Sequence, residues 1–197
     1  MSDQKQSMAA QKVPDKQKAI LEAAIAMFAE RGFWNTSTSL IAKTAGVADG
    51  TLFNYFETKD DLINEVYLYI KRKVANLQLD GLSAHLMIHD AMRHIWNRYI
   101  DWGVQYPEEF KVLYQIKDSY QLSEAVKAEQ NTLFAEIAGR TARSIAEGEL
   151  RNYPADFLAA FLDSHAIMTI QFIAANHDTT VDYRALSFDI LWNGITH

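Results

Sequence analysis

Residues 37–59 read STSLIAKTAGVADGTLFNYFETK, and this stretch decides the fold of the first part of the chain. It predicts two short helices joined by a turn at Gly46, where the first helix must end. Leu52 and Phe56 are four residues apart and therefore share one face of the second helix. The rest of that helix carries small, polar and aromatic residues that cannot all be buried: Gly50, Thr51, Phe53, Asn54 and Tyr55.

The outer face of this second helix distinguishes it from an ordinary core helix. A helix in the major groove of DNA needs close approach, hydrogen-bonding groups and stacking surfaces, and these residue types supply all three. A globular core gains nothing from the same arrangement. The stretch therefore indicates a helix–turn–helix element that reads DNA.

Helical periodicity continues on both sides of this element. Apolar residues recur at three- and four-residue spacing from Asp15 to Arg31. Ser37 or Thr38 is expected to cap the next helix, and Thr58 a long fourth helix. No stretch alternates convincingly as a strand would, so the predicted fold class is all-α. The helices expected in the remainder are 84–105, 107–118, 122–147, 155–176 and 183–195.

Composition limits the function. The chain has 197 residues, of which 49% are hydrophobic and only three are proline, which favours long helices over a turn-rich β architecture. The sequence has no cysteine, which excludes disulfides, thiolate zinc sites and cysteine nucleophiles. No apolar run approaches the roughly 18–20 residues of a membrane span, and the polar start lacks a signal-peptide core. A cytoplasmic protein with no membrane partner is therefore expected.

The net charge of −6 is unevenly distributed. Residues 1–78 carry ten Lys/Arg against nine Asp/Glu, a net of +1, whereas residues 79–197 carry nine against sixteen, a net of −7. The acidity therefore belongs to the second part of the chain. Any DNA contact by the first part must come from locally placed cations and helix dipoles rather than from a broad basic surface.

The order and spacing of IAKTAGV, ADGTLFNYF and ETKDDL, between a first helix and a long following one, resemble the DNA-binding domain of the TetR/AcrR family of one-component transcriptional regulators. The resemblance covers roughly residues 15–72. It implies a homodimer that binds a palindromic operator and releases it when a small molecule enters the C-terminal domain. The expected organisation is a disordered tail over 1–13, a helix–turn–helix DNA-binding domain over 14–57, a connecting helix over 58–80, and a helical ligand-binding and dimerisation domain over 81–197.

The residues of the second short helix have individual expected roles. The Thr51 hydroxyl reaches a phosphate or a base edge, or is simply solvated, and Gly50 lets the backbone approach the duplex closely. Phe53 is a candidate for packing on a thymine methyl group, although it could instead be a core aromatic. Asn54 is a candidate for an amide pairing with adenine.

Further candidates flank that helix. The resemblance assigns Tyr55 and Lys59 to phosphate contacts, and Lys59 also lies beside the start of a long helix, which favours anions. Lys43 is a weaker phosphate candidate that could equally be an ordinary surface charge. The complete set of predicted DNA-binding residues is Thr38, Lys43, Gly50, Thr51, Phe53, Asn54, Tyr55 and Lys59.

Three positions depart from the family pattern. Ala48 replaces a serine that caps the recognition helix, and Asp49 replaces a residue that is often lysine. We expect Asp49 to take over as the cap, while its charge either repels a phosphate or reads a cytosine amine. Leu40 replaces a residue that is commonly acidic.

The second part of the chain is expected to bind the effector. Residues 84–120 carry seven Trp, Tyr and Phe side chains, more than surface helices usually hold, so some must be core. His165 could orient a mostly apolar ligand or could be hydrogen-bonded in place. The predicted ligand-binding residues are Trp96, Tyr99, Tyr114, Phe134 and His165. The effector is expected to be small and either apolar or aromatic.

Two helices near the C-terminus are expected to form the dimer. Residues 155–173 are apolar on nearly every side, which predicts burial both in their own domain and against a second subunit. Residues 183–195 show the same character. Four helices, two from each subunit, would meet around a two-fold axis.

Other functions have weaker support in the sequence. His85 and His89 are four residues apart, with His94 beyond, but their spacing implies no third ligand, so neither a metal nor a cofactor is expected. No nucleophile elbow or phosphate loop indicates an enzyme. The sequence therefore predicts a ligand-responsive DNA-binding regulator, most simply a repressor. The alternative is a ligand-independent helical interaction protein with a vestigial helix–turn–helix.

Overall fold

A computed structural model describes residues 14–176 and 180–197. Within these residues the chain forms ten α-helices and no strand, which confirms the all-α prediction. The helices divide into two compact units, the first ending at Ile63 and the second beginning at Asn64, inside helix α4 (Lys59–Leu79). The expected disordered tail over 1–13 lies outside the described residues, and the expected boundaries at 57 and 80 remain predictions.

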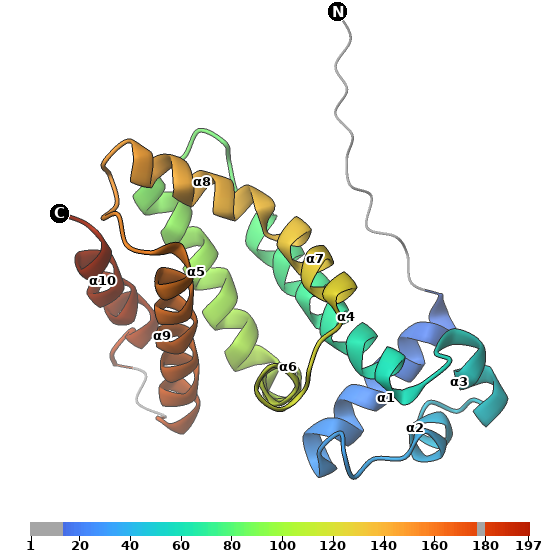
Figure 1. The fold of residues 1–197 in the computed structure, drawn as a ribbon. Helices are drawn as coiled ribbons and strands as arrows, with labels where there is room; N and C mark the ends of the chain where they lie inside the picture. The colour runs from blue at the N-terminus through green and yellow to red at the C-terminus, as the bar shows by residue number, and fades with distance from the viewer. Residues whose placement is uncertain (1–13, 177–179) are drawn as a thin grey trace, which may run out of the picture. The chain divides into compact units, whose positions relative to one another are not determined.

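The first unit contains three helices followed by the start of α4 (Figure 1). They are α1 (Asp15–Arg31), α2 (Thr38–Thr44) and α3 (Asp49–Tyr55), and each contacts the other two. The predicted apolar positions form their shared core, because residues at helical spacing point to the same side. Its large buried side chains include Ile20, Leu21, Phe28, Ile41, Leu52 and Phe56.

The turn between α2 and α3 has the geometry that the sequence predicts at Gly46. This glycine has φ +69°, in the left-handed region that favours glycine. Its N–H donates to the Lys43 carbonyl at 3.2 Å, and the Val47 N–H donates to the Ala42 carbonyl at 3.0 Å. These two bonds satisfy carbonyls that the end of α2 would otherwise leave unpaired. The turn fixes where α3 starts.

Both predicted serine and threonine caps are present. The Ser37 hydroxyl accepts the Leu40 N–H at 3.2 Å and begins α2. At the start of α4, the Thr58 hydroxyl accepts the Asp61 N–H at 3.1 Å, while the Asp61 carboxylate accepts the Thr58 N–H at 3.0 Å. This reciprocal pair is a capping box with aspartate in the usual place of glutamate.

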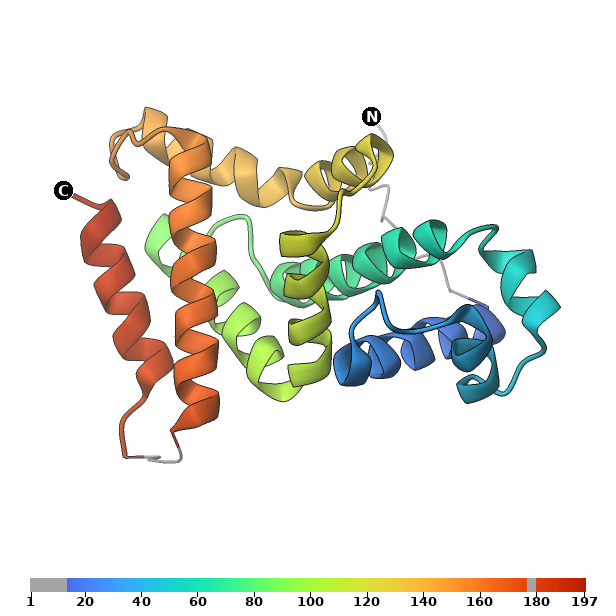
Figure 2. The ribbon, with the colours of Figure 1, turned by 60° about the horizontal axis from the view of Figure 1, so that its bottom comes forward.

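The second unit surrounds α5, which contacts four other helices. Figures 1 and 2 show α9 and α10 side by side, and both pack against α5. Gly103 on α5 is where α5 and α9 approach closely, because a Cβ atom there would lie 2.3 Å from Ile170 Cδ1. The helices are α5 (Ile88–Gln105), α6 (Pro107–Ser119), α7 (Glu124–Leu133), α8 (Ala135–Ala146), α9 (Ala155–Ala175) and α10 (Tyr183–Ile195).

Several predicted helix boundaries differ in the structure. The helix expected over 122–147 is divided at Phe134, whose φ of −105° and ψ of 10° leave the helical region and separate α7 from α8. The helix expected from 84 begins at Ile88, and the helix expected over 155–176 ends at Ala175. Periodicity located the helices and did not locate their ends.

Helices α9 and α10 each have one buried and one exposed apolar face. On α9, Leu158 and Ile170 are buried, whereas Phe157 is 63% exposed. On α10, Leu191 is buried and Ile190 is 59% exposed. By length and composition α9 could cross a membrane, with a mean hydropathy of 1.5, contrary to the expectation that no segment could. An apolar helix that packs on two sides has the same composition.

Candidate DNA-recognition helix and ligand cavity

Helix α3 exposes the side chains that the sequence singles out. Leu52 is fully buried and anchors the helix, whereas Phe53 is 46% exposed and Tyr55 is 38% exposed. Asn54 is also exposed, and Thr51 is half-buried. Phe53 is therefore not a core aromatic, and that alternative is wrong. The exposed side of α3 is a continuous row of polar and aromatic groups on a firmly anchored helix.

The remaining predicted DNA contacts lie around α3 in the first unit. Lys43 is exposed in the last turn of α2, and Thr38 is half-buried at its first position. Gly50 is exposed, and a Cβ atom there would meet nothing within 4 Å, so packing within the protein does not require glycine. The Lys59 amine donates to the Trp34 carbonyl at 3.4 Å, which holds it over the loop between α1 and α2.

Trp34 is a residue that the sequence interpretation overlooked. Its side chain is 64% exposed, on the loop between α1 and α2, and its ring centroid lies 4.8 Å from that of Phe33. Among the four tryptophans it is the one with a largely exposed ring. An aromatic residue in a loop has no periodicity to mark its exposure, so only the structure reveals it.

The predicted cap of α3 by Asp49 is wrong. Helix α3 starts at Asp49 itself, so Ala48 occupies the cap position and makes no side-chain hydrogen bond. The Asp49 carboxylate instead accepts the Ser39 hydroxyl at 2.9 Å. A residue inside the first turn is placed to bond across to α2, whereas a cap must precede the helix.

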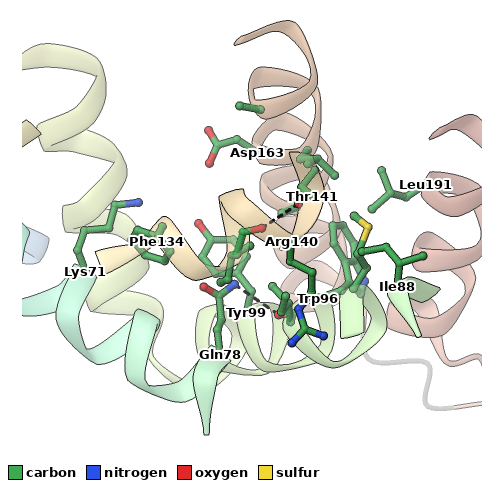
Figure 3. A pocket seen from close by; sticks show the side chains of 16 residues that line it. Lys71, Gln78, Ile88, Trp96, Tyr99, Phe134, Arg140, Thr141, Asp163 and Leu191 are labelled. Atoms are coloured by element: carbon green, nitrogen blue, oxygen red, sulfur yellow. Dashed lines mark hydrogen bonds between the residues drawn. The ribbon is translucent and has the colours of Figure 1, made fainter. Parts of the chain in front are cut away.

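The second unit contains a cavity of about 250 Å³. It is lined from α4, α5, α7–α8, α9 and α10, and its wall is mainly apolar, with Lys71 and Asp163 at a polar end and the Arg140 guanidinium apart from them (Figure 3). Trp96, Tyr99 and Phe134 line it as the sequence predicts. The lining also includes residues that were not singled out as ligand contacts, among them Lys71, Gln78, Arg140, Thr141 and Asp163.

Two predicted ligand residues do not line the cavity. Tyr114 lies one hydrogen bond behind the wall, with its hydroxyl 2.7 Å from that of Tyr99. The His165 Nε2 lies 3.0 Å from the Ser187 carbonyl and 2.9 Å from the Ser187 hydroxyl. His165 also lies against the Trp96 ring, with 5.4 Å between centroids. Its contacts match the alternative interpretation, a histidine hydrogen-bonded in place.

The polar end of the cavity has unusual electrostatics. The Tyr114 hydroxyl donates to Asp163 at 2.9 Å, and the Lys117 amine bonds the same carboxylate. Burial raises the pKa of Tyr99 and Tyr114 well above the ordinary tyrosine range. Burial also lowers the pKa of the Lys71 amine to about 8, although nearby Asp163 opposes the shift.

The histidines considered as metal ligands have other contacts. The His89 Nδ1 lies 2.9 Å from its neighbour Asp90, and its ring packs edge-on against Trp192 with 4.8 Å between centroids. Across residues 14–176 and 180–197, no group of three or more His, Cys, Asp or Glu side chains is arranged to hold a metal ion.

The fold and these two sites define a class: an all-helical protein with a helix–turn–helix unit and a second, cavity-bearing helical unit. Residues 20–66 match the family described as bacterial regulatory proteins, tetR family. The HTH-type transcriptional regulator LuxR of Vibrio harveyi is 30% identical over 86 residues, which cover 44% of this chain and 42% of that protein. The chain therefore aligns with less than half the length of this curated relative.

Solved structures match over nearly the whole chain. A TetR-family transcription regulator of Marinobacter aquaeolei VT8 is 24% identical with a TM-score of 0.85, covering 92% of this chain and 96% of its own. One from Shewanella sp. PV-4 is 25% identical with a TM-score of 0.84, covering 94% and 100%. Residues 20–66 therefore match the DNA-binding part of TetR-family regulators, and the chain is similar in fold to solved regulators of that family over more than nine-tenths of its length.

Proposed function

We propose that this protein is a ligand-responsive repressor that binds a palindromic operator as a homodimer and releases it when a small apolar or aromatic effector occupies the cavity. Its place of action would be the cytoplasm, where the operator lies. The observation that carries the DNA-binding part is the exposed side of α3. Phe53 and Asn54 face outward there while Leu52 anchors the helix in the core.

Base and phosphate contacts would divide along α3 and its flanks. Phe53 and Asn54 offer an apolar surface and an amide for base edges in the major groove. Thr38, Lys43, Thr51, Tyr55 and Lys59 would contact the phosphate backbone. Gly50 supports this arrangement, because a side chain there would point into space that the protein leaves open. Close approach of DNA gives a reason for glycine that packing does not.

The homodimer would form through the exposed apolar faces of α9 and α10. Phe157, Phe161 and Phe172 on α9 are 41–63% exposed, as are Leu186 and Ile190 on α10 at 49% and 59%. Large apolar side chains exposed together on two adjacent helices are typical of an interaction site. The same surface on both subunits suits a two-fold axis, which would present two α3 helices to successive major grooves.

Effector binding would act through the spacing of the two α3 helices. A ligand shifts a conformational equilibrium only if it binds the two states with different affinity. Helix α4 starts with Lys59 in the first unit, and Lys71 and Gln78 further along line the cavity. A single helix therefore carries residues of both proposed sites. We infer that effector binding favours a position of α4 in which the α3 helices no longer match the operator.

Selection of genomic fragments on the purified protein tests the proposal. Fragments retained at physiological salt are sequenced, and a shared inverted repeat is expected, bound at least about 10³-fold more tightly than bulk DNA. Phe53→Ala and Asn54→Ala should lose this preference. Lys18→Ala, a change at an exposed lysine on α1, should keep it. Retention of no fragment above bulk DNA would favour a helical interaction protein with a vestigial helix–turn–helix.

A further inference from the structure

Three consecutive cations lie on α4, and the first of them lacks an acidic partner. Arg72 and Lys73 form ion pairs of 2.6–2.7 Å with the glutamates Glu65, Glu129 and Glu109. No carboxylate or other acceptor in the described part of the chain lies within hydrogen-bonding distance of the Lys71 amine. This amine lines the cavity. Arg72 and Lys73 therefore belong to a network of ion pairs, whereas Lys71 is directed at the cavity.

The contacts of the Lys71 amine within the described part of the chain are with aromatic rings. Its nitrogen lies 5.2 Å from the ring centroid of Phe134 and 5.7 Å from that of Tyr67. Ring faces stabilise a positive charge but accept hydrogen bonds poorly. Burying an ammonium without acceptors is costly, and here the cost appears as a pKa lowered to about 8. A bound acceptor at this point would remove that cost.

The other polar side chains of the cavity wall already have partners within the protein. Gln78, Arg140 and Thr141 donate to main-chain carbonyls at 3.0–3.5 Å, and Tyr99 is bonded to a tyrosine hydroxyl at 2.7 Å. Figure 3 shows the guanidinium of Arg140 well apart from the Lys71 amine. Within the described wall, Lys71 is therefore the cation that makes no hydrogen bond to the protein, whereas Arg140 is held by two main-chain carbonyls.

The nearby carboxylate limits the charge of that ligand. Asp163 is bonded by Lys117 and accepts the Tyr114 hydroxyl, so its charge is already balanced. Lys71 then adds one positive charge that forms no ion pair of its own, beside an Asp163 carboxylate that Lys117 already pairs. A single negative charge would match it, whereas a doubly charged phosphate would bring excess charge close to Asp163.

We propose that the cavity binds a compact apolar carboxylic acid, whose carboxylate accepts hydrogen bonds from the Lys71 amine. Its apolar body lies between the rings of Phe134 and Trp96 and the aliphatic wall. This inference rests on the proposed ligand-binding role of the cavity and names the chemistry of the ligand. A volume of about 250 Å³, below the roughly 300–1,000 Å³ typical of drug-sized ligands, selects a small acid.

Three probes with one chain length test the role of charge. Octanoate, octan-1-ol and octyl phosphate are titrated into the full-length protein at pH 7 by calorimetry, without DNA. Octanoate is expected to bind about tenfold or more tightly than the other two. Lys71→Met should weaken octanoate about tenfold and leave octan-1-ol unchanged. Lys111→Met, at an exposed lysine on α6, is the matched control and should bind like the wild type.

Several results would overturn the proposal. These are equal binding of octanoate and octan-1-ol, a preference for octyl phosphate, no binding of any probe, or an unchanged octanoate preference in Lys71→Met. Lys71→Gln, which stays polar and uncharged, replaces Lys71→Met if circular dichroism shows that variant unfolded. Operator release is measured separately. Tight octanoate binding without release would leave the carboxylate site standing and refute the proposed repressor mechanism.

Discussion

The Ser39 hydroxyl donates a 2.9 Å hydrogen bond to the Asp49 carboxylate, which joins α2 to the first residue of α3. The family resemblance leads one to expect a cation near this point, yet the chain has an acid there and holds it with a neutral partner. A negative charge is thus retained at the start of the helix that we propose enters the major groove. It opposes the approach of phosphates.

Replacing Asp49 by asparagine should therefore strengthen operator binding. Exposed charge interactions are worth about 0.2–1 kcal/mol, which corresponds to a gain of roughly 1.4- to 5-fold in affinity. The unfolding free energy should fall by about 0.3–1 kcal/mol, because an acid in the first turn favours the helix. Fluorescence anisotropy and urea unfolding measure the two effects, with Glu22→Gln on α1 as the control. Weaker binding by Asp49→Asn would mean that the carboxylate reads a base.

Alanine substitutions at two adjacent residues of α3 should have different effects, one on operator affinity and the other on stability. Phe53→Ala should lower operator affinity by about tenfold or more with little change in stability, because its ring is 46% exposed. Leu52→Ala should cost about 2–5 kcal/mol of unfolding free energy, because its side chain is fully buried. Anisotropy and denaturant unfolding on both variants check the pair. A Phe53→Ala protein that unfolds as easily as Leu52→Ala would refute this division of roles.

The close approach of α5 and α9 predicts a steric effect at Gly103. Gly103→Ala would place a Cβ atom 2.3 Å from Ile170 Cδ1, so it should destabilise the fold by about 1–3 kcal/mol. Adding Ile170→Val, which shortens that side chain, should recover part of the loss. Gly139→Ala on α8 meets nothing within 4 Å and should stabilise its helix by about 0.5–1 kcal/mol. Thermal unfolding compares the three; equal melting temperatures would contradict the predicted contact.

Lys71 should reduce the stability of the ligand-free protein near neutral pH. Its pKa is lowered from 10.5 to about 8, so the unfolded chain holds the proton more tightly than the folded one. Lys71→Met should raise the unfolding free energy at pH 7 by on the order of 1–3 kcal/mol. This gain should shrink as pH rises above about 8, because the folded wild type then loses the buried charge.

Neighbouring groups define the pH window for that measurement. Burial raises the pKa of Tyr67, whose ring faces the Lys71 amine, to about 12, so its phenol stays neutral in the folded protein. Unfolded tyrosines titrate near pH 10, so the comparison belongs between about pH 7 and 9.5. Parallel urea unfolding of wild type and Lys71→Met gives the difference. A pH-independent difference would show that the ammonium is not the cause.

The exposed apolar face of α10 should hold the dimer together. Ile190→Asp places a charge on a side chain that is 59% exposed, so the isolated subunit should keep its fold. Burying that charge in a dimer interface would be costly, so the variant should be monomeric by light scattering. Asn131→Asp adds the same charge at an exposed position of α7 and should remain dimeric. An unchanged dimer in Ile190→Asp would place the interface elsewhere.

Much of the DNA-recognition site could be predicted from short-range patterns. The spacing of Leu52 and Phe56, the left-handed turn at Gly46 and the capping residue Thr58 all act within a few neighbours along the chain. The role of Asp49 could not be predicted in this way. Its partner Ser39 is ten residues away, and the bond depends on how α2 and α3 pack.

The cavity was less predictable, because it is assembled from helices distant in the sequence. Aromatic density over residues 84–120 indicated Trp96 and Tyr99, which line the cavity, yet it also indicated Tyr114, which lies behind the wall. In the sequence Lys71 is followed directly by Arg72 and Lys73, so it looks like an ordinary surface cation. Its position in the cavity follows from the packing of α4 against other helices.

The sequence by itself determined the helix–turn–helix unit, the all-helical fold and the residues that α3 exposes, because helix periodicity and turn chemistry are local properties. Only the tertiary structure decided which polar groups are already satisfied and which are left facing a cavity. Hydrogen-bond partners such as Asp163 and Lys117 come from different helices. Whether a buried amine such as Lys71 has an acceptor depends on all the helices around it, and no local pattern encodes that.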